Sequence, residues 1–243
     1  MIIISLVCSK GGVGKTTTAA ALAAYLHVKK KKNVLMLDVD SQASLSKHVG
    51  VNTPDITLDE IILQDRTPKK AIVKTSCGDI IPAGIGLAGI DLVIGANSNA
   101  LETIINDVGG NYDYIIIDTP PSFSCLSVAA ITLSQAVIIP VTPQYLSLEG
   151  LQQILSNWDA KNLLGVLPTM VDRRKRVTNE VLALYKKHLG GMLYKAEIRQ
   201  NVKLEEAPSH GKSIFEYAPR STGAKCYEDF AKETLRRINR CQN

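Results

Sequence analysis

The segment that most constrains the fold is residues 8–18, with the sequence CSKGGVGKTTT. It follows the apolar run Ile2–Val7 and precedes an alanine-rich stretch. Glycine permits backbone conformations that let successive N–H groups face one anion, and the first turn of a helix adds a positive dipole. A lysine and a threonine at the start of that helix suit a phosphate group and its magnesium ion. The sequence therefore predicts a strand, a phosphate-binding loop (P-loop) and a helix, in that order.

Each part of this loop has a predicted role in binding a nucleotide. Lys15 would reach the β- and γ-phosphates, Thr16 would give its hydroxyl to Mg²⁺, and Thr17 would contact the α-phosphate from the first helical turn. The alternative is a simple glycine turn before a helix, but chance rarely produces the whole pattern in a chain of this length. The backbone N–H groups expected to face phosphate oxygens are those of Gly11, Gly12, Val13 and Gly14.

Two residues depart from the common P-loop pattern. Ser9 stands where the pattern has its first glycine, and Lys10 precedes Gly11 and Gly12. Because Lys10 lies five residues before Lys15, it does not easily serve the same phosphate, but it would reach the nucleotide of a facing subunit. The loop is therefore of the deviant Walker-A type, and a face-to-face dimer follows as a hypothesis. The alternative is a Lys10 that is only solvated.

Two aspartates follow apolar runs and are candidates for the same site. Asp40 lies in the segment LMLDVDSQ at residues 35–42, and Asp118 lies in YIIIDTPP at residues 114–121. The carboxyl ends of parallel strands are where such sheets place ligand chemistry, and Asp118 has the usual Walker-B position for the water shell of Mg²⁺. An isolated aspartate at a strand end is often only a helix cap. Beside a P-loop, we expect Thr16, Asp40 and Asp118 to serve the metal.

Short apolar runs alternate with helical segments along the chain, which is typical of a parallel sheet with helices on both faces. We predict an α/β fold with a mostly parallel, twisted sheet, in a single domain over residues 1–243 because no flexible linker divides the chain. The expected strands are Ile2–Val7, Val34–Leu37, Asp79–Pro82, Tyr114–Ile117, Ala136–Val141 and Leu163–Met170. The expected helices are Lys15–Lys30, Leu58–Gln64, Ala100–Asp107, Leu148–Ala160, Thr178–Leu189 and Ser221–Arg240.

Composition excludes several classes of protein. The five cysteines form no CxxC pair, which favours a reducing, cytoplasmic compartment. No apolar run approaches the roughly 20 residues that span a bilayer. Only Met1 precedes the first expected strand, so we expect no N-terminal helix-turn-helix extension and no sequence-specific operator binding. The net charge of +5 permits contact with nucleic acid.

With these motifs, the chain resembles the ParA-type partition ATPases of the deviant Walker-A group, which are relatives of the MinD and nitrogenase iron-protein ATPases. The resemblance covers nearly the whole chain. It rests on KGGVGKTT at residues 10–17, DVDSQ at 38–42, DTPP at 118–121, LEG at 148–150 and RQNVKLEEAPSHGK at 199–212. The last segment is the most specific to the family.

The resemblance implies a weak, Mg²⁺-dependent ATPase in which ATP closes a sandwich dimer and hydrolysis reopens it. Lys10 would contact the partner's phosphates, Asp40 would orient the attacking water, and Asp118 would serve the Mg²⁺ shell. Together with Lys15 these are the expected catalytic residues, and Asn201 would lie near adenine. The resemblance also implies binding to duplex DNA, stimulation by a ParB-type centromere-binding protein, and a cytoplasmic, nucleoid-associated location.

Some positions depart from the family pattern. Ser41 stands where the family usually has proline, and Arg199 and Gln200 replace its usual proline and arginine, which leaves the adenine contacts there open. Lys203 stands where the family often uses arginine for DNA, and it keeps the charge but loses the bidentate geometry.

Contact with DNA of any sequence requires cations on one side of the protein rather than side chains that read bases. The sequence RRKR at residues 173–176 supplies a dense cationic group after an expected strand. The alternative is a solvated loop with ordinary surface charge. The candidate DNA-binding residues are Arg173, Arg174, Arg176, Lys203, Lys212 and Arg220.

Three other functions remain as alternatives. A MinD-like membrane- or protein-positioning ATPase would share the ATP site and add an amphipathic C-terminal anchor, but the apolar residues of the last helix have the spacing of a helix packed on its own domain. An iron–sulfur reductase would need two cysteines per subunit at a dimer axis, and beside Cys125 only Cys77 is central. A client-delivery ATPase would need a metal pair or an apolar groove, and the sequence shows no signal for either.

Overall fold

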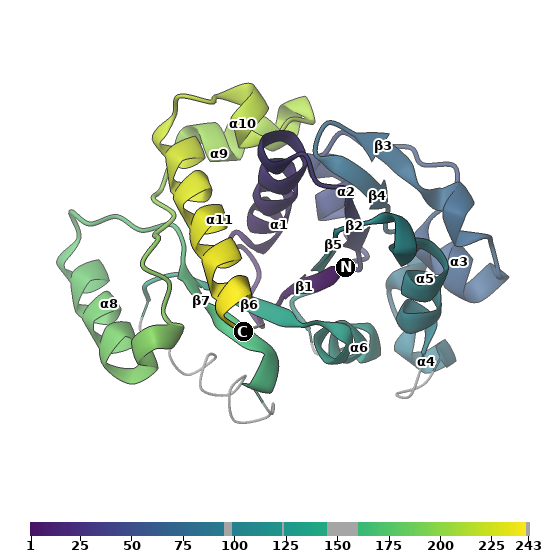
Figure 1. Cartoon of the computed structure of the whole chain (residues 1–243), viewed down its shortest axis with the longest axis horizontal. Coiled ribbons are helices and arrows are strands. Elements are labelled where there is room, and N and C mark those ends of the chain that lie inside the picture. Colours follow the sequence, from purple (N-terminus) through teal and green to yellow (C-terminus); the bar gives the residue numbers. More distant parts are fainter. Residues whose placement is uncertain (95–98, 123, 145–159, 242–243) are drawn as a thin grey trace.

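The computed structural model describes residues 1–94, 99–122, 124–144 and 160–241. Its centre is a seven-stranded sheet of order β3-β4-β2-β5-β1-β6-β7 (Figure 1). All neighbouring strands are parallel except β3 and β4. The predicted α/β class with a mostly parallel sheet is therefore confirmed. The strands are β1 Ile2–Leu6, β2 Val34–Asp38, β3 Val73–Thr75, β4 Gly78–Ile81, β5 Tyr114–Asp118, β6 Ala136–Val141 and β7 Leu163–Pro168.

Helices cover both faces of this sheet (Figure 1). The predicted helices are confirmed to within a few residues where they are described, but residues 148–159 of the predicted helix Leu148–Ala160 lie outside the described part of the chain. The α-helices are α1 Lys15–Ala24, α2 Ser44–His48, α3 Leu58–Gln64, α4 Asp91–Ile94, α5 Ala100–Val108, α6 Cys125–Leu133, α8 Arg176–Leu189, α9 Val202–Glu206, α10 Ile214–Tyr217 and α11 Thr222–Cys241.

Successive strand residues point to opposite faces and build two main cores. Ile4 and Leu6 of β1 belong to a cluster with α1, α2, α10 and α11, whereas Ile3 belongs to a cluster with α3, α5 and α6. Ile139 and Val141 of β6 form a third cluster with α8. Strands that are buried on both faces lose the alternation of polar and apolar residues, which explains their continuous apolar sequences.

Some elements differ from the sequence prediction. The predicted helix Lys15–Lys30 is α-helical only to Ala24 and continues as a π-helical turn over Tyr25–Lys29. Strand β7 ends at Pro168 rather than Met170, because Met170 adopts a positive φ of 52°, which is not an extended conformation. Helix α6 escapes prediction because its sequence is apolar almost all round and carries no helical period.

The three-residue strand β3 also escapes prediction. It is antiparallel to β4 and one of its residues, Lys74, is exposed, so its sequence lacks a buried run. The pairing depends on Gly78, whose φ is 115° and whose backbone lies so close to Val34 that an added Cβ would be 2.8 Å from the Val34 carbonyl oxygen. Only glycine tolerates both conditions.

No helix among the described residues combines the length and the apolar composition that crossing a membrane requires.

We predict that His48 makes the stability of the fold depend on pH. The side chain is buried in α2, and burial lowers its pKa from 6.5 to about 4. The unfolded chain therefore takes up a proton at His48 below pH 6.5 that the native chain refuses, so the stability that His48 contributes is full above that pH and falls as the solution becomes more acidic. Between about pH 7.5 and pH 5 this contribution to the free energy of unfolding should fall by roughly 2 kcal/mol.

Urea unfolding at the two pH values measures this contribution. His48→Gln should show a smaller loss at acidic pH than the unmodified protein, whereas His188→Gln, at an exposed histidine of α8, should keep the full loss. Equal losses in all three proteins would contradict the assignment.

Candidate functional site

The P-loop connects β1 to α1 and borders open space. Gly12 and Gly14 have φ values of 74° and 81°, in the left-handed region that glycine adopts without strain. A Cβ added at Gly11 or Gly12 would meet no atom within 4 Å. Helix α1 begins without a capping side chain or an acidic residue in its first turn. Its N-terminal N–H groups and positive dipole end are therefore available to an anion, which fits the phosphates of a nucleotide.

Two threonines hold this loop in place. The Thr169 hydroxyl lies 2.7 Å from the Val13 carbonyl oxygen and 3.1 Å from that of Val141 at the end of β6. The Thr18 hydroxyl donates to the Gly14 carbonyl oxygen at 2.7 Å and lies 3.1 Å from the Tyr227 hydroxyl on α11. Thr169 belongs to none of the sequence motifs that predict the site. Its only signal is its position at the carboxyl end of a buried strand.

An ion pair lies at the centre of the site. The Lys15 ammonium is 2.7 Å from Asp118 Oδ1, and the Thr16 hydroxyl donates to Asp118 Oδ2, also at 2.7 Å. Lys15 and Asp118 are both buried, with 7% and 0% exposure. Burial raises the pKa of Asp118, and the adjacent Lys15 opposes that rise. The structure thus brings together the predicted phosphate ligand and the predicted Walker-B aspartate.

Asp40 lies beside this pair. Its Oδ1 accepts from the Gln42 N–H at 3.0 Å, and its charge contributes to the raised pKa of Asp118. The chain turns sharply after it, since the Ala43 N–H donates to the Asp40 carbonyl oxygen and Ala43 has a φ of 52°. Asp40 keeps 8% exposure, so a buried carboxylate faces the same region as the P-loop ligands.

Asp38 is a further buried carboxylate, to which the sequence analysis assigns no role. It pairs in register with Asp118 on the neighbouring strand, and its Oδ2 accepts from the N–H and the hydroxyl of Ser46 at 2.8 and 2.7 Å. Burial and the charge of Asp118 raise its pKa to about 7. Its Oδ1 accepts from the Asp40 N–H at 3.3 Å, so Asp38 holds the backbone of the Asp40 loop.

The remaining predicted nucleotide residues lie around this centre. Lys10 is half-buried and interacts with other groups of the chain. Thr17 is in the first turn of α1. A bridge between Val171 and Arg199 places the segment before Asn201 beside the carboxyl end of β7. The Asn201 side chain accepts from the Lys203 N–H at 2.9 Å as the N-cap of α9.

The candidate DNA-binding cations have acidic partners. Arg173 pairs with Glu197, Arg174 with Asp172 at 2.8 Å, Arg176 with Glu180 at 2.8 Å, Lys203 with Glu206 at 2.8 Å and Lys212 with Glu216 at 3.7 Å, while Arg220 is exposed. Exposed pairs of this kind contribute about 0–1 kcal/mol. A phosphate backbone would therefore compete for these cations at little cost.

Comparison with known proteins identifies the family. A family model described as AAA domain matches residues 1–162. The sporulation initiation inhibitor protein Soj of Bacillus subtilis is 41% identical, over 95% of this chain and 97% of that protein. The chromosome-partitioning ATPase Soj of Thermus thermophilus is 36% identical, over 97% and 96%. This chain belongs to the Soj/ParA family. Membership makes it an ATPase of the chromosome-partitioning type, as the resemblance implies.

A solved structure that aligns with nearly the whole chain supports the assignment of a nucleotide site. This structure is cobyrinic acid a,c-diamide synthase from Mycobacterium smegmatis with a bound ATP analog and magnesium. Its TM-score to this chain is 0.80, and the two sequences are 28% identical. The match covers 97% of this chain and 95% of that chain.

We predict that the Thr169 hydroxyl is required for the shape of the P-loop. Thr169→Val should lower the free energy of unfolding by roughly 1–3 kcal/mol, because the Val13 carbonyl oxygen loses the donor at 2.7 Å, whereas the Val141 carbonyl oxygen keeps the Thr169 N–H. It should also weaken ADP binding, since the Val13 carbonyl is no longer held. Thr169→Ser keeps the hydroxyl and should retain both properties. Urea unfolding and ADP titration measure the two effects, and equal ADP affinity in both variants would contradict the prediction.

Proposed function

We propose that this chain is a single-domain partition ATPase whose ATP-bound dimer binds duplex DNA without sequence preference. Hydrolysis, stimulated by a ParB-type partner, would release the DNA. The observation that carries the proposal is the buried cluster of Lys15, Thr16 and Asp118 beside an open P-loop. The relationship to Soj supports the partition role. The location that follows is cytoplasmic and nucleoid-associated.

The residues of the site suit ATP with Mg²⁺. The loop N–H groups and Lys15 would hold the phosphates, with Thr17 on the α-phosphate and Asn201 on the adenine side. Thr16, Asp40 and Asp118 offer the oxygen ligands that Mg²⁺ and its waters prefer. Bound Mg²⁺ would neutralise charge on the phosphate oxygens.

ATP binding requires an exchange of partners within the chain. Lys15 and Thr16 both bond to Asp118 in this structure, so each must turn from the carboxylate toward the nucleotide. Asp118 keeps the buried position from which it would sense the γ-phosphate. Asp40 supplies a carboxylate acceptor that would orient the attacking water. Its backbone is held by Asp38, which suits a residue that must be positioned accurately.

Lys10 supports the proposed dimer. A second loop lysine beside a site that already has Lys15 fits a contact with the partner's phosphates, and ATP would then join the two subunits. Only the dimer would present two cationic surfaces at once. When one surface binds DNA, the second is held at a high effective concentration near the same duplex, which raises the DNA affinity of the dimer. Hydrolysis would separate the subunits and remove that gain. The bound nucleotide would thereby control DNA binding, although the cationic surface of each subunit stays the same.

The DNA contacts are proposed at Arg173, Arg174, Arg176, Lys203, Lys212 and Arg220. Their ion pairs with acidic side chains are weak, so these cations would exchange their acidic partners for DNA phosphates at little cost. The MinD-like alternative fits less well, because the buried residues Tyr227, Phe230 and Ile238 direct the apolar face of α11 into its own core. The described part of α11 therefore offers no apolar face to a membrane.

We predict that Asp40→Ala separates ATP binding from hydrolysis. The variant should bind ATP and DNA as the unmodified protein does, because its phosphate and DNA ligands are intact, and it should lose turnover. Phosphate release and ATP titration measure the two properties. Asp55→Ala, at an exposed aspartate, is the control and should keep normal turnover. Loss of ATP binding in Asp40→Ala would show that Asp40 is structural.

A second prediction concerns the DNA surface. Random-sequence duplex should bind with ATP·Mg²⁺ but not with ADP or without nucleotide, and binding should weaken with salt. Arg174→Ala with Lys203→Ala should keep ATP-driven dimerisation, lose DNA affinity, and reduce the salt slope by roughly two. Lys69→Ala with Lys70→Ala removes the same charge near β3 and should bind normally. DNA binding that ignores nucleotide, or an unchanged affinity of the first double variant, would contradict the proposal.

A further inference from the structure

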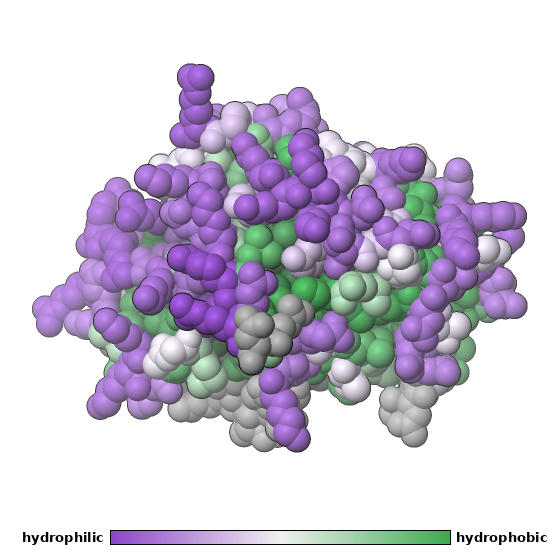
Figure 2. All heavy atoms as spheres, in the orientation of Figure 1, coloured by the Kyte–Doolittle hydropathy of each residue, from purple (hydrophilic) through white to green (hydrophobic). Residues whose placement is uncertain are grey.

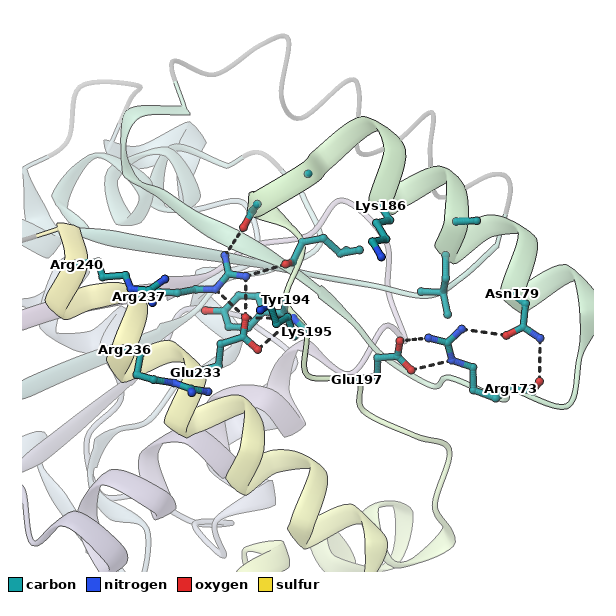
Figure 3. Close-up of a pocket in the computed structure, with 15 residues that line it drawn as sticks. Arg173, Asn179, Lys186, Tyr194, Lys195, Glu197, Glu233, Arg236, Arg237 and Arg240 are labelled. Atoms are coloured by element: carbon teal, nitrogen blue, oxygen red, sulfur yellow. Dashed lines mark hydrogen bonds and ion pairs between the residues drawn. The ribbon is translucent and has the colours of Figure 1, made fainter.

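A second cavity lies beside the edge strand β7, outside the nucleotide site. It has a volume of about 850 Å³, within the range of small-molecule sites, and lies between α8 and α11 beside the edge of the sheet (Figure 3). Helix α8 packs on the sheet face of Ile139 and α11 on the face of Ile138, so the cavity spans the edge strand β7. None of the P-loop residues lines it.

One wall of this cavity is rigidly built around Arg237. Its guanidinium bonds to Glu233 and to the carbonyl oxygens of Leu164, Gly191 and Leu193, at 2.7–3.1 Å (Figure 3). It also lies 4.2 Å from the centre of the Tyr194 ring. Arg237 thus holds the segment after α8 against β7, and its charge is compensated by Glu233 and these carbonyl oxygens.

The remaining charges of the cavity are unbalanced. In the part of the chain that the structure describes, its lining contains six cationic side chains and two carboxylates, Glu197 and Glu233. Both carboxylates are occupied, Glu197 by Arg173 and Glu233 by Arg237 and the N–H groups of Lys195 and Ala196. Among the described residues, four of the cations have no acidic partner; these are Lys186, Lys195, Arg236 and Arg240.

The four unpartnered cations approach the cavity from different elements. Lys186 extends from α8 toward the space in front of Tyr194, while Arg236 and Arg240 come from α11 on the other side (Figure 3). Arg236 and Arg240 are four residues apart and therefore neighbours on one helix face. Figure 2 shows the strongly hydrophilic surface over this half of α11. Like charges that line one cavity repel one another and favour a multivalent anion between them.

We propose that this cavity is a second anion site, which binds a compact polyphosphate. Closely spaced phosphate groups would bridge α8 and α11 by accepting from Lys186, Arg236 and Arg240. The ligand would be recognised by its phosphates rather than by a base, because Arg237 covers the face of Tyr194 and Tyr194 is buried, leaving no aromatic ring for stacking. The hollow between two helices suits a compact anion better than the broad surface of a duplex.

Calorimetric titration of the full chain with inorganic tripolyphosphate tests this site. ADP with excess Mg²⁺ fills the P-loop beforehand, and tripolyphosphate is added in the same magnesium buffer. We expect saturable binding of one anion per chain. Lys186→Ala with Arg240→Ala should weaken it by about tenfold or more, as expected for loss of charge-assisted hydrogen bonds. These side chains are exposed, so the fold should be unaffected.

The matched control removes the same charge from the same two helices. Lys187→Ala with Lys225→Ala alters exposed lysines that do not line the cavity and should leave the affinity unchanged. Lys195→Ala with Arg236→Ala is a second cavity variant and should repeat the loss. Equal affinity in cavity and control variants, or no binding to the unmodified protein, would overturn the proposal. So would displacement of tripolyphosphate by random-sequence duplex with a parallel loss of DNA affinity in the cavity variants, which would assign the cations to DNA.

Discussion

The interaction on which the site depends is the buried ion pair between Lys15 and Asp118. A lone charge at this depth would be strongly destabilising, whereas the pair, with the Thr16 hydroxyl as a further donor, is compensated. The pair joins the first turn of α1 to the end of β5, the strand that lies between β1 and β2. It also keeps the proposed phosphate ligand and the proposed metal ligand at one point, so a nucleotide would enter by exchanging partners rather than by assembling a site.

Hydrogen bonds around the ion pair hold the other segments of the site in place. Thr169 holds the P-loop against the ends of β6 and β7, Thr18 joins α1 to α11 through Tyr227, and Asp38 holds the Asp40 loop. The first two contacts join residues distant in sequence, whereas Asp38 and Asp40 are two residues apart. The contact between Thr18 and Tyr227 connects the nucleotide site to α11, the helix whose far half borders the cationic cavity. The P-loop and the cationic cavity are therefore both connected to α11.

The sequence predicts secondary structure well where an element is buried along its whole length. Ala136–Val141 is apolar throughout and matches β6 in full, because a strand covered on both faces leaves a continuous signal. Prediction is weaker where a short element depends on a distant contact. Strand β3 needs Gly78 against Val34, and α6 is apolar on every side, so neither has a local period. The roles of Lys10 and Asn201 and the DNA contacts stay predictions, since each depends on a partner subunit or a ligand.

The sequence alone determined the α/β class, the P-loop and the two strand-end aspartates Asp40 and Asp118. These follow from local pattern, since apolar runs, glycine freedom and helix starts are properties of neighbouring residues. Only the tertiary structure decided that Asp118 pairs with Lys15, that Asp38 and Thr169 hold the site, and that four cations of α8, α11 and the segment between them surround one cavity. Apart from the bond between Asp38 and the Asp40 N–H, those contacts join residues far apart in the chain, and packing of the sheet and its helices brings them together.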